Sequence, residues 1–312
     1  MIEALNVICL GGAGTFGHAL ARRRKLDGWT GKMTIYSTDS IKHEKMRREY
    51  PDINFVQGDI RNPDTLFNAM VGHDVVIHAA AVKVIPTSEF YSIDTFDVNV
   101  NGSQCVCSTA IRAHIKHVLA ISTDKAAHPA NAYGASKYLM EKLVQEYSRQ
   151  DFETQFHLVR FGNVLESNGS VIEAWRKAVQ RGEPIKMTDP EMTRFFLSPR
   201  QAVQYAIDAL ELQPGHIFIP LLPSLSIGKL AEYIVGDVEI EEVPLRPGEK
   251  IHESLLTFEE IWYCERSYGK LGEARDLRPT TTKRNDTPYL PLISNTVLEL
   301  THDELIELLD NG

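Results

Sequence analysis

Short apolar runs recur along the first half of the chain, and several of them are rich in β-branched residues. We predict six strands from these runs: Asn6–Leu10, Met33–Ser37, Asn54–Gln57, Val75–Ala79, Val118–Ser122 and Phe156–Arg160. Longer amphipathic or charged segments lie between them, as in Gly14–Lys25, Asp64–Met70 and Asp97–His114, and these predict helices. This alternation is typical of a doubly wound α/β fold, in which helices cover both faces of a parallel sheet.

The alternation weakens after about Gly162, where prolines, glycines and charged turns become denser. A helix over Val203–Leu210 and a strand over His216–Pro220 are expected to return to the sheet. We therefore predict a dinucleotide-binding domain over residues 1–165, with 195–222 returning to it. Residues 166–194 and 223–312 are expected to form a smaller, mixed C-terminal substrate-binding domain.

Composition narrows the class of protein. The chain has 312 residues, 43% of them hydrophobic and 24% charged, which suits a soluble globular protein with a real core. Its net charge of −9 gives no basic bias, so we expect no nucleic-acid or membrane partner. The cysteines Cys9, Cys105, Cys107 and Cys264 lack the spacing of a disulfide framework and predict reduced thiols in a cytoplasmic protein.

The first predicted strand is followed at once by GGAGTFG. Gly11, Gly14 and Gly17 form a GxxGxxG pattern, which overlaps a GxGxxG pattern that begins at Gly12. Glycines let the backbone turn tightly and let a pyrophosphate approach the amides at the start of the next helix. A plain glycine-rich turn is the alternative, but the position between a strand and a helix favours a Rossmann-type dinucleotide site.

The end of the second predicted strand bears on the choice of nucleotide, because an acid there favours NAD and a nearby cation favours NADP. The segment is YSTDSIKHEK, with neutral Ser37 and Thr38, acidic Asp39 and basic Lys42, so the pattern is mixed. Asp59, after the third strand, suits an adenine contact, although capping the next helix is an alternative role. HAAA, which ends the fourth strand, suits the close passage of a cofactor.

The most chemically crowded stretch is STDKAAHPANAYGASK, residues 122–137. Tyr133 and Lys137 are spaced i and i+4, so on a helix they share one face. A nearby ammonium is expected to lower the tyrosine pKa, and Tyr133 could then take a proton from a substrate hydroxyl. A solvated helix face is the alternative, but the preceding glycine motif and the strand ending in Ser-Thr favour catalysis. His114 and His117 have no acidic or thiol neighbour to complete a metal site, so no metal is expected.

Several motifs together resemble the extended short-chain dehydrogenase/reductase family: GGAGTFG, GDIRN, HAAAVK, ISTDKAAHPANAYGASK, VRFGNVLESNGSV, MTRFF and RPGEKIHE. Within it the chain is similar to the inverting UDP-N-acetylglucosamine 4,6-dehydratases of polysaccharide biosynthesis. The resemblance implies a lyase that oxidises carbon 4 of a UDP-N-acetylhexosamine, eliminates water across carbons 5 and 6 with inversion at carbon 5, and returns the hydride to carbon 6. Because this cycle is redox-neutral, the cofactor need not leave.

The resemblance also implies roles for individual positions. The catalytic residues would be Thr123, Asp124, Lys125, Tyr133 and Lys137, with Lys125 as a base of lowered pKa and Asp124 as the acid of the elimination, or with these two roles exchanged. The substrate-binding residues would be Lys83, Asn163, Arg194, Arg246 and Glu249, with the arginines near the diphosphate. The cofactor-binding residues would be Gly11, Gly14, Thr15, Phe16, Gly17, Ser37, Asp39, Lys42, Asp59, Ile60, Ala79, Ala80, Ala81, Lys83, Asn99, Tyr133 and Lys137.

Other functions stay open on the sequence alone. UDP-sugar epimerases carry the same motifs, and a nucleotide-sensing binding protein could keep the glycines, although it would be expected to lose the Tyr133–Lys137 pair. The family often has an arginine at Thr38, so the expected preference for NADP over NAD rests on Lys42. We expect a UDP-sugar substrate and a homo-oligomer.

Overall fold

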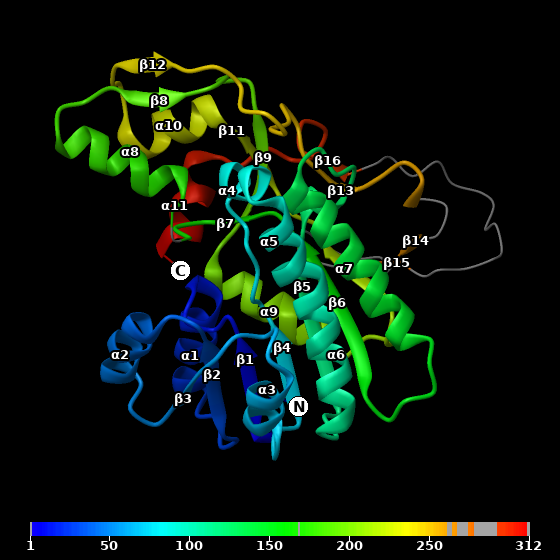
Figure 1. The fold of residues 1–312 in the computed structure, drawn as a ribbon. Helices are drawn as coiled ribbons and strands as arrows, with labels where there is room; N and C mark the ends of the chain where they lie inside the picture. Colours follow the sequence, from blue (N-terminus) through cyan, green and yellow to red (C-terminus); the bar gives the residue numbers. More distant parts are fainter. Residues whose placement is uncertain (1, 168, 261–263, 267–273, 278–291, 311–312) are drawn as a thin grey trace.

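The computed structural model describes residues 2–167, 169–260, 264–266, 274–277 and 292–310 (Figure 1). Within these ranges, nine strands form one sheet in the order β14-β15-β10-β6-β5-β4-β1-β2-β3. Seven of them are parallel: β1 (Val7–Leu10), β2 (Met33–Ser37), β3 (Asn54–Gln57), β4 (Val75–His78), β5 (His117–Thr123), β6 (Gln155–Phe161) and β10 (Ile217–Pro220). The strand order reverses between β1 and β4, as in a Rossmann fold. The predicted fold class is therefore confirmed.

Two antiparallel strands, β15 (Ala274–Leu277) and β14 (Cys264–Arg266), extend the sheet beyond β10. The sequence pattern did not predict them. Among the cysteines, Cys9, Cys105 and Cys107 are free thiols, while the side chain of Cys264 lies outside the described residues.

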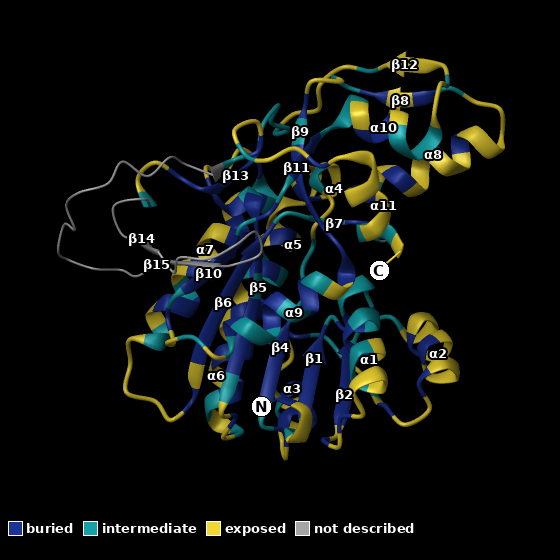
Figure 2. Ribbon diagram, turned by 180° about the vertical axis from the view of Figure 1, so that it is seen from behind, coloured by how far each residue is buried: buried dark blue, intermediate teal, exposed yellow. Residues whose placement is uncertain are grey.

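Helices cover both faces of the sheet (Figure 1). On one face α1 packs against α9, and on the other α6 packs against both α3 and α7. The central strands β1, β4, β5 and β6 are mostly dark and buried in Figure 2, whereas the helices expose their outer sides. The helices of this part are α1 (Thr15–Asp27), α2 (Ser40–Glu49), α3 (Pro63–Met70), α4 (Ile85–Phe90), α5 (Ser92–Phe96), α6 (Gly102–Arg112), α7 (Ala132–Ser148) and α9 (Pro199–Ala209).

Local sequence explains where the helices begin. Ser198 and Gln201 form a reciprocal capping box at the start of α9, and Pro199 takes the first helical position. The predicted helix over Asp97–His114 is interrupted, because Asp97–Asn101 forms a π-helical turn before α6 begins. A π-turn inside a helix often marks a functional site, and this one carries Asn99.

A smaller group of elements lies beyond the carboxyl ends of the parallel strands, at the top of Figure 1. It has a hydrophobic core of its own, built around Trp175, Phe196 and Leu230. Its elements, with the short strands that join it to the sheet, are β7 (Asn163–Val164), α8 (Val171–Gln180), β8 (Ile185–Met187), β9 (Thr193–Leu197), β11 (Ser224–Ser226), α10 (Ile227–Val235), β12 (Ile240–Glu242), β13 (Ser254–Leu256), β16 (Leu292–Ile293) and α11 (His302–Asp310). The domain boundaries and the homo-oligomer stay predictions.

None of the described helices combines the length and the apolar character that crossing a bilayer requires. The described ranges also contain no cluster of three or more histidine, cysteine, aspartate or glutamate side chains placed to hold a metal ion.

Candidate active site

The glycine-rich loop lies at the carboxyl end of β1, beside the point where the strand order reverses. Gly11 has a positive φ of 75°, and a Cβ there would come within 2.6 Å of the Ala80 backbone. A Cβ on Gly17 would lie 1.8 Å from the Gly12 carbonyl oxygen. Protein contacts therefore require both of these glycines, one for the turn and one for the packing of α1 on β1.

Gly14 differs, because protein packing does not require a glycine there. The nearest atom that its Cβ would meet is the Gly11 carbonyl oxygen, at an ordinary 3.5 Å. Gly14 is the N-cap of α1, and no side chain caps this helix. The start of α1, with Thr15 and Phe16 as its first residues, therefore leaves room for an anionic group to approach the backbone, which fits a dinucleotide.

The residues after β2 mostly bond to one another. The Ser37 hydroxyl lies 2.7 Å from His43 Nε2. Asp39 caps α2 by accepting from the Lys42 amide at 2.9 Å, and its carboxylate also lies 3.0 Å from Lys42 Nζ. The acid and the cation that sequence analysis weighed against each other thus form an ion pair. This pair partly offsets the charge that Lys42 could offer to a ribose phosphate.

Asp59 does not cap α3, so that alternative is wrong. Asn62 takes the N-cap position because Pro63 occupies the first helical turn, and its side chain accepts from two backbone amides. The Asp59 carboxylate instead lies 2.7 Å from Arg61 Nη2. Ile60 is buried against Gly102, at the start of α6.

The segment after β4 passes close to the glycine loop. The Ala79 amide donates to the Leu10 carbonyl at 2.9 Å. The backbone of Ala80 lies directly against Gly11, and Ala81 is the next residue along this segment. The Lys83 residue as a whole is solvent-exposed, but nearby protein atoms remove part of the water around its ammonium and so lower its pKa. The positive charge of Lys42 lowers this pKa further. The ammonium groups of Lys42 and Lys83 are therefore near enough to repel each other.

Asn99 is buried, and its side chain bonds to the protein. Its amide nitrogen donates to the Val82 carbonyl at 2.9 Å and to the Ser136 hydroxyl at 2.9 Å, and its oxygen accepts from the Val82 amide at 2.8 Å. Asn99 therefore ties the segment after β4 to α7. A direct contact between Asn99 and a cofactor stays a prediction.

The turn after β5 brings Thr123, Asp124 and Lys125 together. Asp124 is 0% exposed, and its Oδ1 accepts from the Thr123 hydroxyl at 2.9 Å and from Lys125 Nζ at 2.9 Å. Its second oxygen, Oδ2, is buried and has no hydrogen-bond partner. Because an unsatisfied buried carboxylate oxygen is costly, this atom is a candidate contact for a substrate.

Lys125 differs from expectation. Burial alone would lower its pKa, but the carboxylates of Asp124 and Glu253 raise it, and the net shift is upward. The expectation of a lysine base with a lowered pKa is therefore wrong. Two carboxylates hold this ammonium in its charged form, so Lys125 carries a proton and cannot act as a base in this state.

Tyr133 and Lys137 both lie on α7, one turn apart. Burial raises the pKa of Tyr133 to about 12, and the charge of Lys125 and a hydrogen bond with Thr123 oppose this rise. Lys137 donates instead to the Ile121 carbonyl at 2.6 Å, and burial lowers its pKa to about 8. The expected lowering of the tyrosine pKa by Lys137 is not found, and Lys125 is the cation that acts on Tyr133.

Among the predicted substrate residues, Asn163 contacts the catalytic turn, where its Oδ1 accepts from Lys125 Nζ at 3.3 Å. Arg194 is buried, and its guanidinium donates to the carbonyls of Lys250 and Ile251, each at 2.9 Å. Arg194 therefore holds the RPGEK segment in place, and its contact with a diphosphate stays a prediction.

The RPGEK segment docks against the start of α7. Asn131 caps this helix with its side-chain oxygen, and its amide nitrogen donates to the Gly248 carbonyl at 2.7 Å. Arg246 is exposed, while Glu249 accepts from the Arg246 amide at 3.4 Å. Asn131 and Glu253 were not predicted as site residues, although both stand inside motifs that carry the family resemblance.

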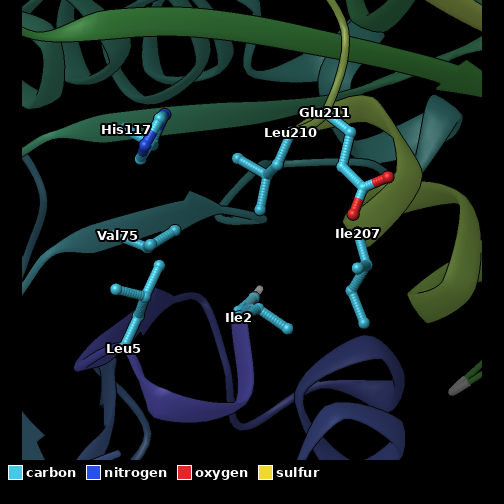
Figure 3. Close-up of a pocket in the computed structure, with 7 residues that line it drawn as sticks. All are labelled: Ile2, Leu5, Val75, His117, Ile207, Leu210 and Glu211. Atoms are coloured by element: carbon cyan, nitrogen blue, oxygen red, sulfur yellow. The ribbon is translucent and has the colours of Figure 1, made fainter.

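A small apolar pocket lies at the opposite, amino-terminal end of the strands, where Val75 begins β4 and His117 begins β5 (Figure 3). It is lined by Ile2, Leu5, Val75, His117, Ile207, Leu210 and Glu211. Ligands of open α/β sheets bind at the carboxyl ends of the strands, so this pocket is separate from the candidate site.

The model of the family described as "Polysaccharide biosynthesis protein" matches residues 7–270. The chain belongs to that family. The UDP-glucose 4-epimerase of Rickettsia conorii is 39% identical over 269 residues, 82% of this chain and 79% of the relative. The inverting UDP-N-acetylglucosamine 4,6-dehydratase of Campylobacter jejuni is 33% identical over 263 residues, with the same coverage of 82% and 79%.

Among solved structures, Pen from Bacillus thuringiensis is 30% identical, with a TM-score of 0.89 over 99% of this chain and 97% of that chain. The resemblance to extended short-chain dehydrogenase/reductases is thus confirmed. Relatives at comparable identity include both an epimerase and a dehydratase of nucleotide sugars. The chain therefore belongs to the nucleotide-sugar dehydratase and epimerase branch of these enzymes.

Proposed function

We propose that this enzyme is a 4,6-dehydratase of a UDP-N-acetylhexosamine, with UDP-N-acetylglucosamine as the first substrate to test. The reaction is oxidation at carbon 4, loss of water across carbons 5 and 6 with inversion at carbon 5, and reduction at carbon 6. The observation that supports it is the buried Asp124–Lys125 pair with its unpartnered oxygen, beside Thr123 and Tyr133. Epimerisation at carbon 4 needs one acid–base group, whereas elimination needs a second acid–base pair.

Tyr133 and Thr123 would handle the carbon-4 hydroxyl. The two side chains share a hydrogen bond, so the threonine can orient the phenol and contact the same substrate hydroxyl. Oxidation to a ketone at carbon 4 makes the proton at carbon 5 acidic. Lys137 would position the turn through its bond to the Ile121 carbonyl on β5.

Asp124 and Lys125 would then carry out the elimination. The Asp124 Oδ2 atom, which has no hydrogen-bond partner, would accept the carbon-5 proton, and the charged Lys125 would donate a proton to the departing carbon-6 hydroxyl. This assignment is the exchanged form of the roles expected first, and the carboxylates around Lys125 favour it.

The cofactor proposed is NADP, held by the glycine loop and the start of α1, with NAD as the alternative. The chemistry that it supplies when bound is hydride transfer from carbon 4 and back to carbon 6. Lys42 and Lys83 act on the same region and together suit an added phosphate, although Asp39 offsets Lys42.

The Lys42→Ala variant should therefore bind NADP more weakly while its affinity for NAD stays the same. Titration of both nucleotides into wild type and variant by calorimetry measures this. Equal affinities for the two nucleotides in the wild type, unchanged in the variant, would contradict the preference.

Arg246 is proposed to bind the diphosphate, because it is exposed in a turn that docks against the start of α7 through Asn131 and Gly248. A charge-assisted contact of this kind is worth about 1.5–3 kcal/mol, so Arg246→Ala should weaken UDP binding by about one to two powers of ten. Calorimetry with UDP alone is the measurement, and Arg181→Ala, at an exposed arginine paired with Glu183, is the matched control. Unchanged UDP affinity in Arg246→Ala would show that RPGEK is only a structural turn.

A UDP-sugar 4-epimerase is the second candidate, favoured by the 39% identity to the Rickettsia protein. Incubation with UDP-N-acetylglucosamine followed by mass spectrometry separates the two functions. A product lighter by one water supports the dehydratase. An isomer of unchanged mass supports the epimerase, and neither product would exclude this substrate.

A further inference from the structure

Glu253 is a buried acid at the junction between the RPGEK segment and β13. It is 3% exposed, and Ser294 holds its backbone from both sides. The Glu253 amide donates to Ser294 Oγ at 2.9 Å, and the Ser294 amide donates to the Glu253 carbonyl at 2.9 Å. Ser294 is itself fixed to the Thr193 carbonyl at 3.0 Å. The backbone that carries the Glu253 carboxylate is therefore firmly placed.

The Glu253 carboxylate lies between two lysines that come from different segments. One oxygen is 3.5 Å from Lys125 Nζ, and the other is 3.2 Å from Lys250 Nζ. The lysine side chains are only 15% and 17% exposed. Lys250 Nζ also donates to the Ala127 carbonyl at 2.9 Å, just beyond the catalytic turn. Glu253 thus joins the catalytic turn to the RPGEK segment.

Charge balance explains why an acid is needed there. The charged groups that act on the Lys125 ammonium are Asp124 and Glu253, which favour its charged form, and Arg194, which opposes it. Asn163 supplies a neutral oxygen. A buried ammonium is costly unless it is paired and hydrogen-bonded. The Asp124 Oδ1 atom already accepts from both Thr123 and Lys125. Without Glu253, Asp124 would be the one remaining carboxylate of this pair to offset the effect of Arg194 on Lys125.

We propose that Glu253 is a positioning residue that fixes the charged Lys125 ammonium beside Asp124 and docks the RPGEK segment on the catalytic turn. In this role it acts on Lys125 and Lys250 through its charge, since its Oε2 atom is buried and makes no hydrogen bond. The inference rests on the proposed function only in giving Lys125 the role of proton donor. The Glu253 carboxylate would thereby link the RPGEK segment, which is proposed to bind the nucleotide, to the catalytic turn, which is proposed to transfer protons.

The test is the Glu253→Gln variant, which keeps the shape of the side chain and removes its charge. With lysine-selective ¹³C labelling, the Lys125 Cε signal, assigned by its loss in Lys125→Met, should titrate roughly one to three units lower than in wild type. If Lys125 donates a proton, the alkaline limb of the pH–rate profile should move to lower pH. The limb moves to lower pH because the charged Lys125 that proton donation requires is lost at a lower pH once its pKa falls.

The Glu253→Asp variant keeps the charge and should restore both properties in part. Glu299→Gln, at an exposed acid paired with Lys229 at 2.7 Å, should change neither. An unshifted Lys125 titration in folded Glu253→Gln would overturn the proposal. If that variant does not fold, Glu253→Asp and Glu253→Ala are compared in the presence of UDP. A lower Lys125 pKa in Glu253→Ala than in Glu253→Asp supports the proposal, and equal pKa values overturn it. A shifted titration in a protein that forms no dehydrated product would reject the proposed function but keep the positioning role.

Discussion

Replacing Asp124 with asparagine should stop the elimination while leaving oxidation at carbon 4 intact. The substitution keeps the size of a side chain that is 0% exposed, but it removes the negative charge from the unpartnered oxygen. Loss of a general base typically costs about 10²–10⁴-fold in rate. We therefore expect a fall of about that size in formation of the dehydrated product.

Two readouts separate the steps in Asp124→Asn. Nicotinamide absorbance after mixing with UDP-N-acetylglucosamine should still report oxidation, while solvent deuterium should no longer enter carbon 5. In Lys125→Met deuterium should still enter, because the base remains, but water should not be lost. Asp27→Asn, at an exposed acid paired with Arg23, is the matched control. Normal exchange in Asp124→Asn with none in Lys125→Met would reverse the two roles.

Replacing Tyr133 with phenylalanine should remove the first step and, with it, every later one. The Tyr133 phenol is hydrogen-bonded to Thr123 and lies near the charge of Lys125. Phenylalanine lacks the hydroxyl and cannot take the proton from the carbon-4 hydroxyl of the substrate. A loss of about 10²–10⁴-fold in the rate of carbon-4 oxidation is expected. Single-turnover nicotinamide absorbance measures this rate directly.

Tyr138→Phe provides the matched control on the same helix. Tyr138 is exposed, and Lys142 Nζ lies 5.0 Å from the centre of its ring, so its hydroxyl has no part in the proposed chemistry. A Tyr133→Phe enzyme that oxidises carbon 4 at the wild-type rate would show that another residue is the base.

The predicted strands agree with the structure to within one residue at each end. Val118–Ser122 was predicted and His117–Thr123 is found, because apolar and β-branched side chains mark a buried parallel strand directly. The sequence pattern did not mark the π-helical turn at Asp97–Asn101, nor the hydrogen bond by which Asn99 in this turn accepts from the Val82 amide.

The site was predictable in its parts but not in its electrostatics. The spacing of Tyr133 and the family resemblance of the motif around Thr123, Asp124 and Lys125 marked these residues as candidates, and the fold brings them together, while their catalytic roles stay predictions. The direction of the Lys125 pKa shift could not be predicted, because Glu253 lies far along the chain and reaches this lysine only through the fold. The same holds for Arg194, whose partners are backbone carbonyls that no sequence pattern marks.

The central claim is that Asp124 and Lys125 form a second proton-transfer pair acting at carbons 5 and 6. Its most direct test is to convert UDP-N-acetylglucosamine with the wild-type enzyme in heavy water and to examine the product by NMR and mass spectrometry. The account predicts a 4-keto product that has lost one water, carries deuterium at carbon 5 and has inverted configuration there. A product that keeps its water and its original carbon-5 proton, with only carbon 4 changed, would contradict it.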